Sequence, residues 1–400
     1  MIRCRSSRTL ILAVPAIVVI AAAGLAACGG STPPPAPTVT VTVPPSSASP
    51  TTSASPSAKP AVKKQLTIAV ASGSATNGIS VIGSSGQVKQ LVAPHGGPVS
   101  DLAWSPDGTR LAYLQAKSVD DPTSTVWVYD TATGKTRSLA GDSAAFTWVG
   151  PTQLIVAAIS TPMHPYRTNG PLYVVDVTKS TRTLVKNAAG HTLRGANPTA
   201  SADGTLVAYV HYNKATGGMI PEQLLLYDAD TLAVSEVTHG GHSSDTDGDS
   251  FSFPSLSPDG SLIYACQTGG DPGFRCIVYR VNGSKVYSSP PLAWPTNGAW
   301  DTKSARLAFG GGSAMVEGLP GAINVWQVGS AKAKQILSWS HSNVGSWLAW
   351  TPLGKQIVYS VPTAGLNGDI WVVNADGTNR HKLLHNGGYP ACTEAPIEFP

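Results

Sequence analysis

The sequence is short of charged residues, and this shortage excludes several classes of protein. Asp, Glu, Lys and Arg make up 12% of its 400 residues, against about a quarter in ordinary soluble domains. Coiled coils and helical bundles carry many more charges on their exposed faces, so neither is expected. Basic and acidic side chains nearly balance, at 27 and 23. The chain therefore lacks the strongly basic surface that nucleic-acid binding requires, and we expect no nucleic-acid partner.

Familiar catalytic motifs are also missing. The sequence contains no Gly-x-Ser-x-Gly elbow of a serine hydrolase and no Walker-type or dinucleotide-binding glycine motif. These absences favour a protein that is not an enzyme, and they leave metal-dependent chemistry as the alternative.

Residues of turns and strands are abundant instead. The chain has 41 glycines and 32 prolines, together with 10 tryptophans and 12 tyrosines. Glycine and proline favour tight turns, and aromatic residues favour strands. The composition therefore indicates many short strands, and the length permits one large all-β domain.

The N-terminal residues have the pattern of a secretion signal. Three arginines within the first eight residues precede an apolar run over residues 10–27. The Leu-Ala-Ala-Cys sequence that ends at Cys28 resembles the lipobox of bacterial lipoproteins, whose cysteine receives a diacylglycerol and becomes the first residue after cleavage. This resemblance implies a signal peptide over residues 1–27 and acyl chains, palmitate among them, at Cys28. The alternative is an uncleaved membrane span.

A low-complexity segment follows the lipobox-like sequence. Residues 28–61 are mostly Pro, Ser, Thr and Ala with almost no charge, a composition that cannot bury enough apolar surface to fold. We expect a disordered tether that holds the following domain away from the membrane, on the extracytoplasmic face of the cell membrane.

A unit of about 47 residues recurs through the rest of the chain. Its first part is two apolar strands joined by a turn such as Ser105-Pro106-Asp107-Gly108, in which each residue type suits its corner. Its second part is another apolar hairpin. The first strand of this second hairpin ends at residues 83, 130, 176, 228, 280, 327 and 374.

Four strands per unit of this length describe the blade of a β-propeller. Only three strands precede the first full unit, and residues 395–400 read as one orphan innermost strand after the last. We therefore predict an all-β, seven-bladed β-propeller over residues 62–400, closed by one C-terminal strand plus three N-terminal strands. The alternative is a six-bladed ring with a loose N-terminal extension.

These repeats resemble the TolB-type, WD-like propeller repeat, which joins a Ser-Pro-Asp-Gly turn to a strand such as Arg110–Tyr113. The resemblance covers residues 64–400 and implies the propeller fold. It implies no catalytic residue, because the repeat residues build turns and blades, and propellers serve as scaffolds, carbohydrate binders, lyases and hydrolase gates alike.

Long loops predict where ligands bind. The loops between the second and third strands of the units are longer than the Pro-Asp-Gly turns, and binding residues concentrate in long loops on rigid scaffolds. These loops and the inter-blade segments share one rim of the predicted ring. The candidate residues for an anionic or sugar-like ligand are His164, Tyr166, Arg167, His191, Arg194, His211 and Trp294.

One loop is a candidate metal site. It contains His239, His242, Asp245, Asp247 and Asp249. The three carboxylates suit Ca²⁺ and the two histidines suit a transition metal. The loop does not match the helix-loop-helix calcium pattern, and the alternative is a solvated turn.

The cysteines have separate predicted roles. Cys266 and Cys276 flank the loop of one hairpin, so adjacent antiparallel strands bring them within disulfide reach. An exported location favours that bridge, and the alternative is two free thiols. Cys392 is left unpaired near the closing strand.

The sequence therefore predicts a monomeric, membrane-anchored extracytoplasmic propeller lipoprotein. It would bind another envelope protein or a cell-wall ligand through its loop-rich face. A metal-dependent propeller enzyme of the polysaccharide lyase or lactonase type is the alternative, and a purely structural spacer is a third interpretation.

Overall fold

Tight turns of fixed side-chain chemistry join the two inner strands of each well-preserved repeat. The Ser105 hydroxyl donates a hydrogen bond to Asp107 Oδ1 at 2.6 Å and accepts one from the Arg110 N–H at 3.0 Å. Equivalent bonds form around Ser201 and Ser257. In each turn the hydroxyl of the first residue accepts a hydrogen bond from the backbone N–H of the residue that follows the turn. This bond holds the two strands in register.

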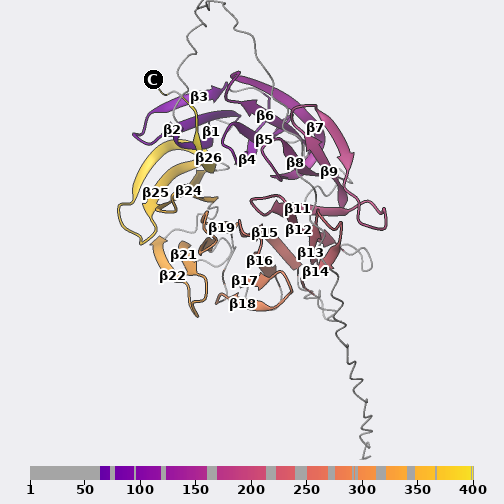
Figure 1. The fold of residues 1–400 in the computed structure, drawn as a ribbon. Helices are drawn as coiled ribbons and strands as arrows, with labels where there is room; N and C mark the ends of the chain where they lie inside the picture. The colour runs from indigo at the N-terminus through magenta and orange to yellow at the C-terminus, as the bar shows by residue number, and fades with distance from the viewer. Residues whose placement is uncertain are drawn as a thin grey trace, which may run out of the picture. The chain divides into compact units, whose positions relative to one another are not determined.

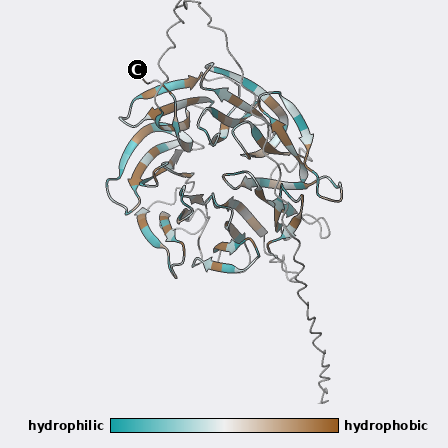
Figure 2. Ribbon diagram, viewed as in Figure 1, coloured by the Kyte–Doolittle hydropathy of each residue, from teal (hydrophilic) through white to brown (hydrophobic). Residues whose placement is uncertain are grey.

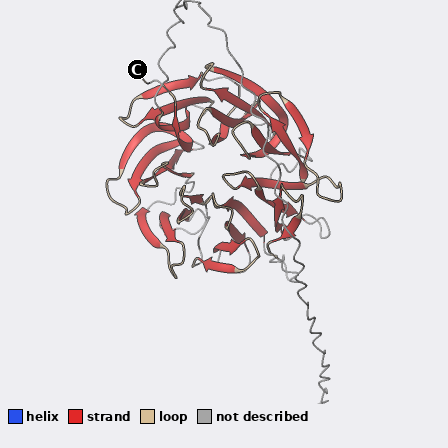
Figure 3. Ribbon diagram, viewed as in Figure 1, coloured by secondary structure: helices blue, strands red, loops and turns tan. Residues whose placement is uncertain are grey.

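A computed structural model describes most of the chain from residue 64 onward, and residues 60–400 form one compact unit. Every regular element it describes is a β-strand (Figure 3). Within this described part, no helix is long and apolar enough to cross a membrane. The described residues are 64–72, 77–93, 96–118, 123–159, 169–212, 222–238, 250–268, 275–290, 292, 296–311, 321–339, 347–364, 367–397 and 399.

Antiparallel pairing groups the strands into four-stranded units, which we interpret as blades and number along the chain (Figure 1). Blades 1 to 3 are built in chain order. Blade 1 holds β4 (Val99–Trp104), β5 (Arg110–Ala116), β6 (Ser124–Asp130) and the first part of β7 (Lys135–Trp148). Blade 2 holds the rest of β7, β8 (Gln153–Ala158), β9 (Gly170–Asp176) and β10 (Thr181–Leu184). Blade 3 holds β11 (Arg194–Ala200), β12 (Leu206–Tyr212), β13 (Glu222–Asp228) and β14 (Val234–Glu236).

Blades 4 to 6 repeat the same order, and blade 7 joins the two ends. Blade 4 holds β15 (Ser250–Leu256), β16 (Leu262–Thr268), β17 (Arg275–Arg280) and β18 (Lys285–Ser288). Blade 5 holds β19 (Ala299–Trp300), β20 (Arg306–Gly311), β21 (Gly321–Gln327) and β22 (Lys334–Trp339). Blade 6 holds β23 (Leu348–Trp350), β24 (Gln356–Ala364), β25 (Asn367–Asn374) and the first part of β26 (His381–Ala395). Blade 7 holds the rest of β26, β1 (Gln65–Ser72), β2 (Gly78–Gly83) and β3 (Val88–Val92).

The closing pairing joins the two ends of the described chain. Strand β26 pairs with β1 from Ala395 opposite Gln65 to Gly387 opposite Ser72, and the yellow β26 lies beside the indigo β1 in Figure 1. The three N-terminal strands are therefore part of a blade and not a loose extension. The prediction that residues 395–400 form the closing strand was wrong in its position, because β26 ends at Ala395 and the prolines that follow carry no N–H for a ladder.

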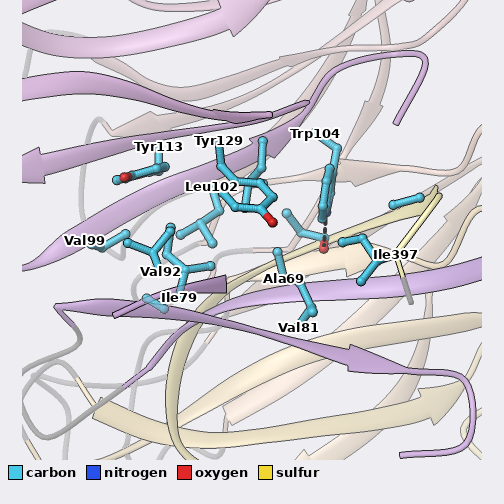
Figure 4. Packing of buried hydrophobic residues seen from close by; sticks show 14 residues of the cluster. Ala69, Ile79, Val81, Val92, Val99, Leu102, Trp104, Tyr113, Tyr129 and Ile397 are labelled. Atoms are coloured by element: carbon cyan, nitrogen blue, oxygen red, sulfur yellow. Dashed lines mark hydrogen bonds between the residues drawn. The ribbon is translucent and has the colours of Figure 1, made fainter. Parts of the chain in front are cut away.

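Apolar side chains from facing sheets form a separate core between each pair of neighbouring blades. Brown apolar and teal polar segments alternate along many strands, as Figure 2 shows. The core between blades 7 and 1 includes Ile79, Trp104, Tyr113 and Ile397 (Figure 4). Because each blade buries both of its faces, it depends on both neighbours for its stability.

Four junctions between blades share an indole hydrogen bond. The donor is a tryptophan at the end of an inner strand, which we call the indole position, and the acceptor is a backbone carbonyl of the preceding blade. The bonds run from Trp104 to Ala391, from Trp148 to Ala103, from Trp300 to Ser255 and from Trp350 to Ala299, at 3.3, 3.0, 2.9 and 2.8 Å. Figure 4 shows the first of them. The indole position holds Ala200, Leu256 and Cys392 in blades 3, 4 and 7.

Candidate functional site

Several inner strands begin with a bulge whose central residue is left-handed. These residues are Asp101, Asn197, Phe253 and Tyr389, with φ values of 51°, 48°, 54° and 51°. At each of them the ladder register shifts. Residues other than glycine rarely adopt this conformation, and such outliers concentrate where function requires them. The bulges lie at the end of the blade opposite the inner turn, where the second strand leads to the third.

A cavity of about 490 Å³ opens along the inner strands. Blades 1, 6 and 7 supply most of its wall, and blades 2 and 5 supply one residue each. Inner strands from five blades therefore meet at this cavity, which places it at the middle of the ring. The residues that decide its chemistry are Asp101, Phe146, Asn297, Trp347, Tyr389 and Cys392.

The cavity lies beside a junction that lacks the indole. Cys392 occupies the indole position of blade 7, and Ala349 occupies the place of the acceptor in blade 6; both line the cavity. A thiol fills much less space than an indole, so this residue leaves room between the two inner strands. Burial raises the pKa of Cys392 to about 12, and the thiol is therefore protonated at neutral pH and unreactive as a nucleophile.

Asp101 gives the cavity its charge. Among the described residues that line it, no other side chain carries a carboxyl group and none is basic. Burial raises the pKa of Asp101, and a hydrogen bond from the Ser100 hydroxyl at 3.1 Å offsets part of that effect. No basic side chain of the described residues forms an ion pair with this carboxylate. Asp101 is thus a poorly hydrated acid without a counterion in this part of the chain.

Aromatic rings and an amide complete the wall. The rings of Trp347 and Tyr389 lie 4.6 Å apart between centroids and are tilted by 39°. Phe146 and Trp104 also line the cavity. The Oδ1 atom of Asn297 is buried without a hydrogen-bond partner among the described residues. A buried polar atom of this kind costs free energy until a donor reaches it.

Three of the predicted binding residues lie elsewhere, between blades 2 and 3. His211 Nδ1 lies 3.0 Å from the Arg194 carbonyl oxygen, and His211 Nε2 lies 3.5 Å from Asn169 Nδ2. His191 belongs to a separate exposed turn, in which its N–H donates to Asn187 Oδ1 at 2.9 Å. The structure therefore brings Arg194 and His211 together, and neither they nor His191 line the cavity.

The other predicted sites lie outside the described residues. This holds for the lipidation site Cys28, for the binding residues His164, Tyr166, Arg167 and Trp294, and for the loop with His239, His242, Asp245, Asp247 and Asp249. Within the described part, no group of three or more His, Cys, Asp or Glu residues is arranged to hold a metal ion. The lipid anchor and the Ca²⁺ or transition-metal site stay predictions.

The predicted disulfide partners face each other and are both thiols in this structure. Cys266 and Cys276 are directly opposed on β16 and β17, and their Sγ atoms lie 3.2 Å apart. The Cys276 backbone bonds to Ser289 on the far side, at 2.9 Å through its N–H and 2.8 Å through its carbonyl. The cysteines therefore form a non-hydrogen-bonded pair, in which opposing side chains come closest. The bridge stays a prediction.

A buried tyrosine packs against the two thiols. The Tyr264 hydroxyl donates to the Thr296 carbonyl oxygen of blade 5 at 2.8 Å and lies 2.9 and 3.0 Å from the two sulfurs. Burial raises the pKa of Cys266 well above its usual range. This pair therefore has a structural place at the junction of blades 4 and 5 and little thiolate at neutral pH.

Sequence reasoning missed the cavity residues because no motif contains them. Asp101, Asn297, Trp347 and Tyr389 each stand four residues before the residue that begins the inner turn or its counterpart. Aligning the repeats at that turn would have revealed the shared position. The four residue types at these positions differ, so they do not belong to the repeated core pattern.

Chains of known structure share this architecture. TolB from Acinetobacter baumannii is 16% identical over 82% of this chain and 66% of its own, with a TM-score of 0.47. Oligogalacturonate lyase from Vibrio parahaemolyticus is 14% identical over 80% of this chain and 85% of its own, with a TM-score of 0.51. A prolyl endopeptidase is 11% identical over 84% of this chain, with a TM-score of 0.56, and this chain spans 51% of it.

Sequence comparison adds no closer relative. No protein-family model matches the chain, and no curated protein matches it. At such low identities the structural likeness shows the fold alone. The chain is an all-β propeller, and its likeness to the lyase and the endopeptidase, with TM-scores above 0.5, supports this fold.

Proposed function

We propose that this chain is a lipid-anchored propeller of the cell envelope that binds a protein or a cell-wall ligand in the cavity at its inner strands. The observation that carries the proposal is the cavity itself, which is lined by Asp101, Trp347 and Tyr389. Ligand sites are typically concave, with a few precisely placed polar groups that fix the orientation of the ligand.

The chemistry of the described wall supports binding over catalysis. Its single thiol, Cys392, is held protonated, and its single carboxyl group, Asp101, has no described acid or base partner in the wall. The lipobox-like sequence at Cys28 and the uncharged residues 28–61 support a tethered extracytoplasmic location.

In-cell crosslinking tests this proposal. The full chain is crosslinked in its native host, purified and analysed by mass spectrometry beside a Cys28→Ala form and a Trp347→Leu form. We expect one envelope component that is recovered with the unchanged chain, reduced by Cys28→Ala and lost with Trp347→Leu. Equal recovery with Trp347→Leu would place the binding surface elsewhere, and an empty experiment would argue against an envelope protein as ligand.

The metal-dependent alternative has its own test. It depends on the loop from His239 to Asp249, which lies outside the described residues. Elemental analysis of the purified chain separates the two functions, because a metalloenzyme retains about one metal ion per chain and loses it in a His242→Ala, Asp247→Ala form.

A further inference from the structure

The cavity wall combines one anion with aromatic faces and contains no described cation. Asp101 supplies the carboxyl group, and Trp104, Phe146, Trp347 and Tyr389 supply the rings. The face of an aromatic ring is the negative end of its quadrupole, so it attracts cations and is most effective where water is excluded. A carboxylate that burial has deprived of water gains most from a positive ligand.

The rest of the wall suits an apolar stem. Leu102, Leu348, Ala349 and Ala391 line the cavity between the polar groups. Methylene groups bury favourably against such residues. The side-chain amide oxygen of Asn297, Oδ1, has no partner among the described residues and adds an acceptor for an N–H donor. An anionic ligand would meet the Asp101 carboxylate without any described basic side chain to compensate.

We propose that this cavity recognises an organic ammonium group carried on an alkyl stem, such as the end of a lysine side chain or a free aliphatic amine. This inference rests on the proposed function and specifies the ligand chemistry of the same site. Asp101 pairs with the ammonium group, the rings of Trp347 and Tyr389 contact its charged end, and the apolar wall holds the stem.

The left-handed bulge explains how Asp101 reaches its place. Its φ of 51° re-aims the residue away from the regular strand direction. Asn197 occupies the equivalent place of blade 3 at φ 48°. Asparagine thus tolerates this left-handed conformation, so Asp101→Asn removes the carboxyl group without adding backbone strain. Asp142 offers a matched control, because it is an exposed aspartate at φ 50° that does not line the cavity.

Ligand-observed NMR titration of the full chain, in detergent and about 150 mM NaCl, tests the inference with butylammonium chloride and with neutral 1-butanol. We expect butylammonium to bind at least about tenfold more tightly than 1-butanol, since a desolvated cation–π contact and an ion pair each approach that factor. Asp101→Asn should weaken butylammonium binding about tenfold or more, and Asp142→Asn should leave it unchanged. Trp347→Leu should weaken binding, and Trp347→Phe should retain most of it.

Equal binding of butylammonium and 1-butanol would overturn the inference, and so would an unchanged affinity in Asp101→Asn. Circular dichroism and the thermal midpoint of each variant establish that it is folded. Two further probes distinguish the sources of the ammonium group: Nα-acetyl-lysine methylamide and its Nε-acetylated form. Binding of the first alone supports a lysine side chain, and binding of butylammonium without either supports a free amine.

The failure of this inference is distinguishable from the failure of the proposed function. If crosslinking yields an envelope partner but butylammonium does not bind, the proposed binding function is supported and the proposed ammonium ligand is wrong. If butylammonium binds but crosslinking yields no partner, the cavity recognises a small amine and the protein-binding function is wrong.

Discussion

The junction between blades 7 and 1 and the junction between blades 6 and 7 have different residues at the indole position. Between blades 7 and 1, Trp104 is 8% exposed, packs in an extensive apolar core and donates its indole N–H to Ala391. Between blades 6 and 7, the same position holds Cys392 and the apolar core is smaller. The cavity, which Trp104 and Ala391 also line, extends to this thiol. Three blades lack the tryptophan at this position, and of their residues Ala200, Leu256 and Cys392 it is Cys392 that lines the cavity. A small side chain at a repeated position thus leaves space beside the inner strands, and the ligand that we propose would use this space.

Removal of the Trp104 side chain should have the largest effect. Trp104→Ala deletes a buried indole and its hydrogen bond, and we expect a loss of about 3–5 kcal/mol in the free energy of unfolding. Trp104→Phe should lose less, because it keeps most of the apolar contact. Urea denaturation measures both, with Leu353→Ala as the control, since Leu353 is 68% exposed. A change below about 1 kcal/mol in Trp104→Ala would mean that the indole does not hold the junction.

The junction of blades 4 and 5 contains a cysteine pair in addition to its indole hydrogen bond. A bridge between Cys266 and Cys276 would close a short loop and add about 2–3 kcal/mol by the chain-entropy argument. Because burial raises the pKa of Cys266, thiolate attack is slow once the chain has folded, so the bridge should form during folding in an oxidising compartment.

Thiol mapping by mass spectrometry checks this prediction. Chain folded under oxidising conditions should show the bridge, and chain folded under reducing conditions should resist later oxidation. The Cys276→Ser form should show no difference between the two preparations. Free thiols after oxidative folding would leave the pair as the two thiols seen in the structure.

Cys392→Trp would give the junction of blades 6 and 7 the tryptophan that four other junctions have. The new indole would enter the space beside Cys392, so the ammonium binding that we propose should be lost. The cost in stability should stay below about 3 kcal/mol, the usual range for overpacking. Cys392→Ala leaves the space open and should bind like the unchanged chain. Retained binding in a folded Cys392→Trp form would separate the cavity from this junction.

Of these substitutions, Asp101→Asn should change the stability of the fold least, and it should raise the thermal midpoint at pH 7. Because the pKa of Asp101 is raised by burial, the folded chain takes up its proton more readily than the unfolded chain, and the ionised form destabilises the fold above that pKa. Asp101→Asn should therefore raise the thermal midpoint at pH 7 and lose this advantage as the pH falls toward 4. A lower midpoint at pH 7 would show that the carboxylate makes a stabilising contact.

The fold was accessible from the sequence because its signals are local. Turns such as Ser257-Pro258-Asp259-Gly260 carry the residues that their geometry requires, and their spacing gives the blade length. The closing strand was misplaced by several residues because the segment around Tyr389–Thr393 has neither a tryptophan at the indole position nor an Asp-Gly turn after it, and each of the other inner strands has at least one of these two signals.

The cavity was less accessible because it arises between distant repeats. Asp101, Asn297 and Trp347 have no sequence relation to one another except their distance from the next turn. The way in which five inner strands converge, together with the small volume of Cys392, decides which of these positions line the same cavity. Such properties appear only after the ring is assembled.

The long strand β26 also sets the order in which the chain can be completed. Its first part belongs to blade 6 and its last part is the innermost strand of blade 7. A nascent chain holds β1 to β3 from early in synthesis, but these strands lack their inner neighbour until residues 387–395 emerge. Contacts between such distant segments form late and slowly. The ring, and with it the cavity between blades 6, 7 and 1, therefore forms only when residues 387–395 have paired with β1, and the binding that we propose would begin only then.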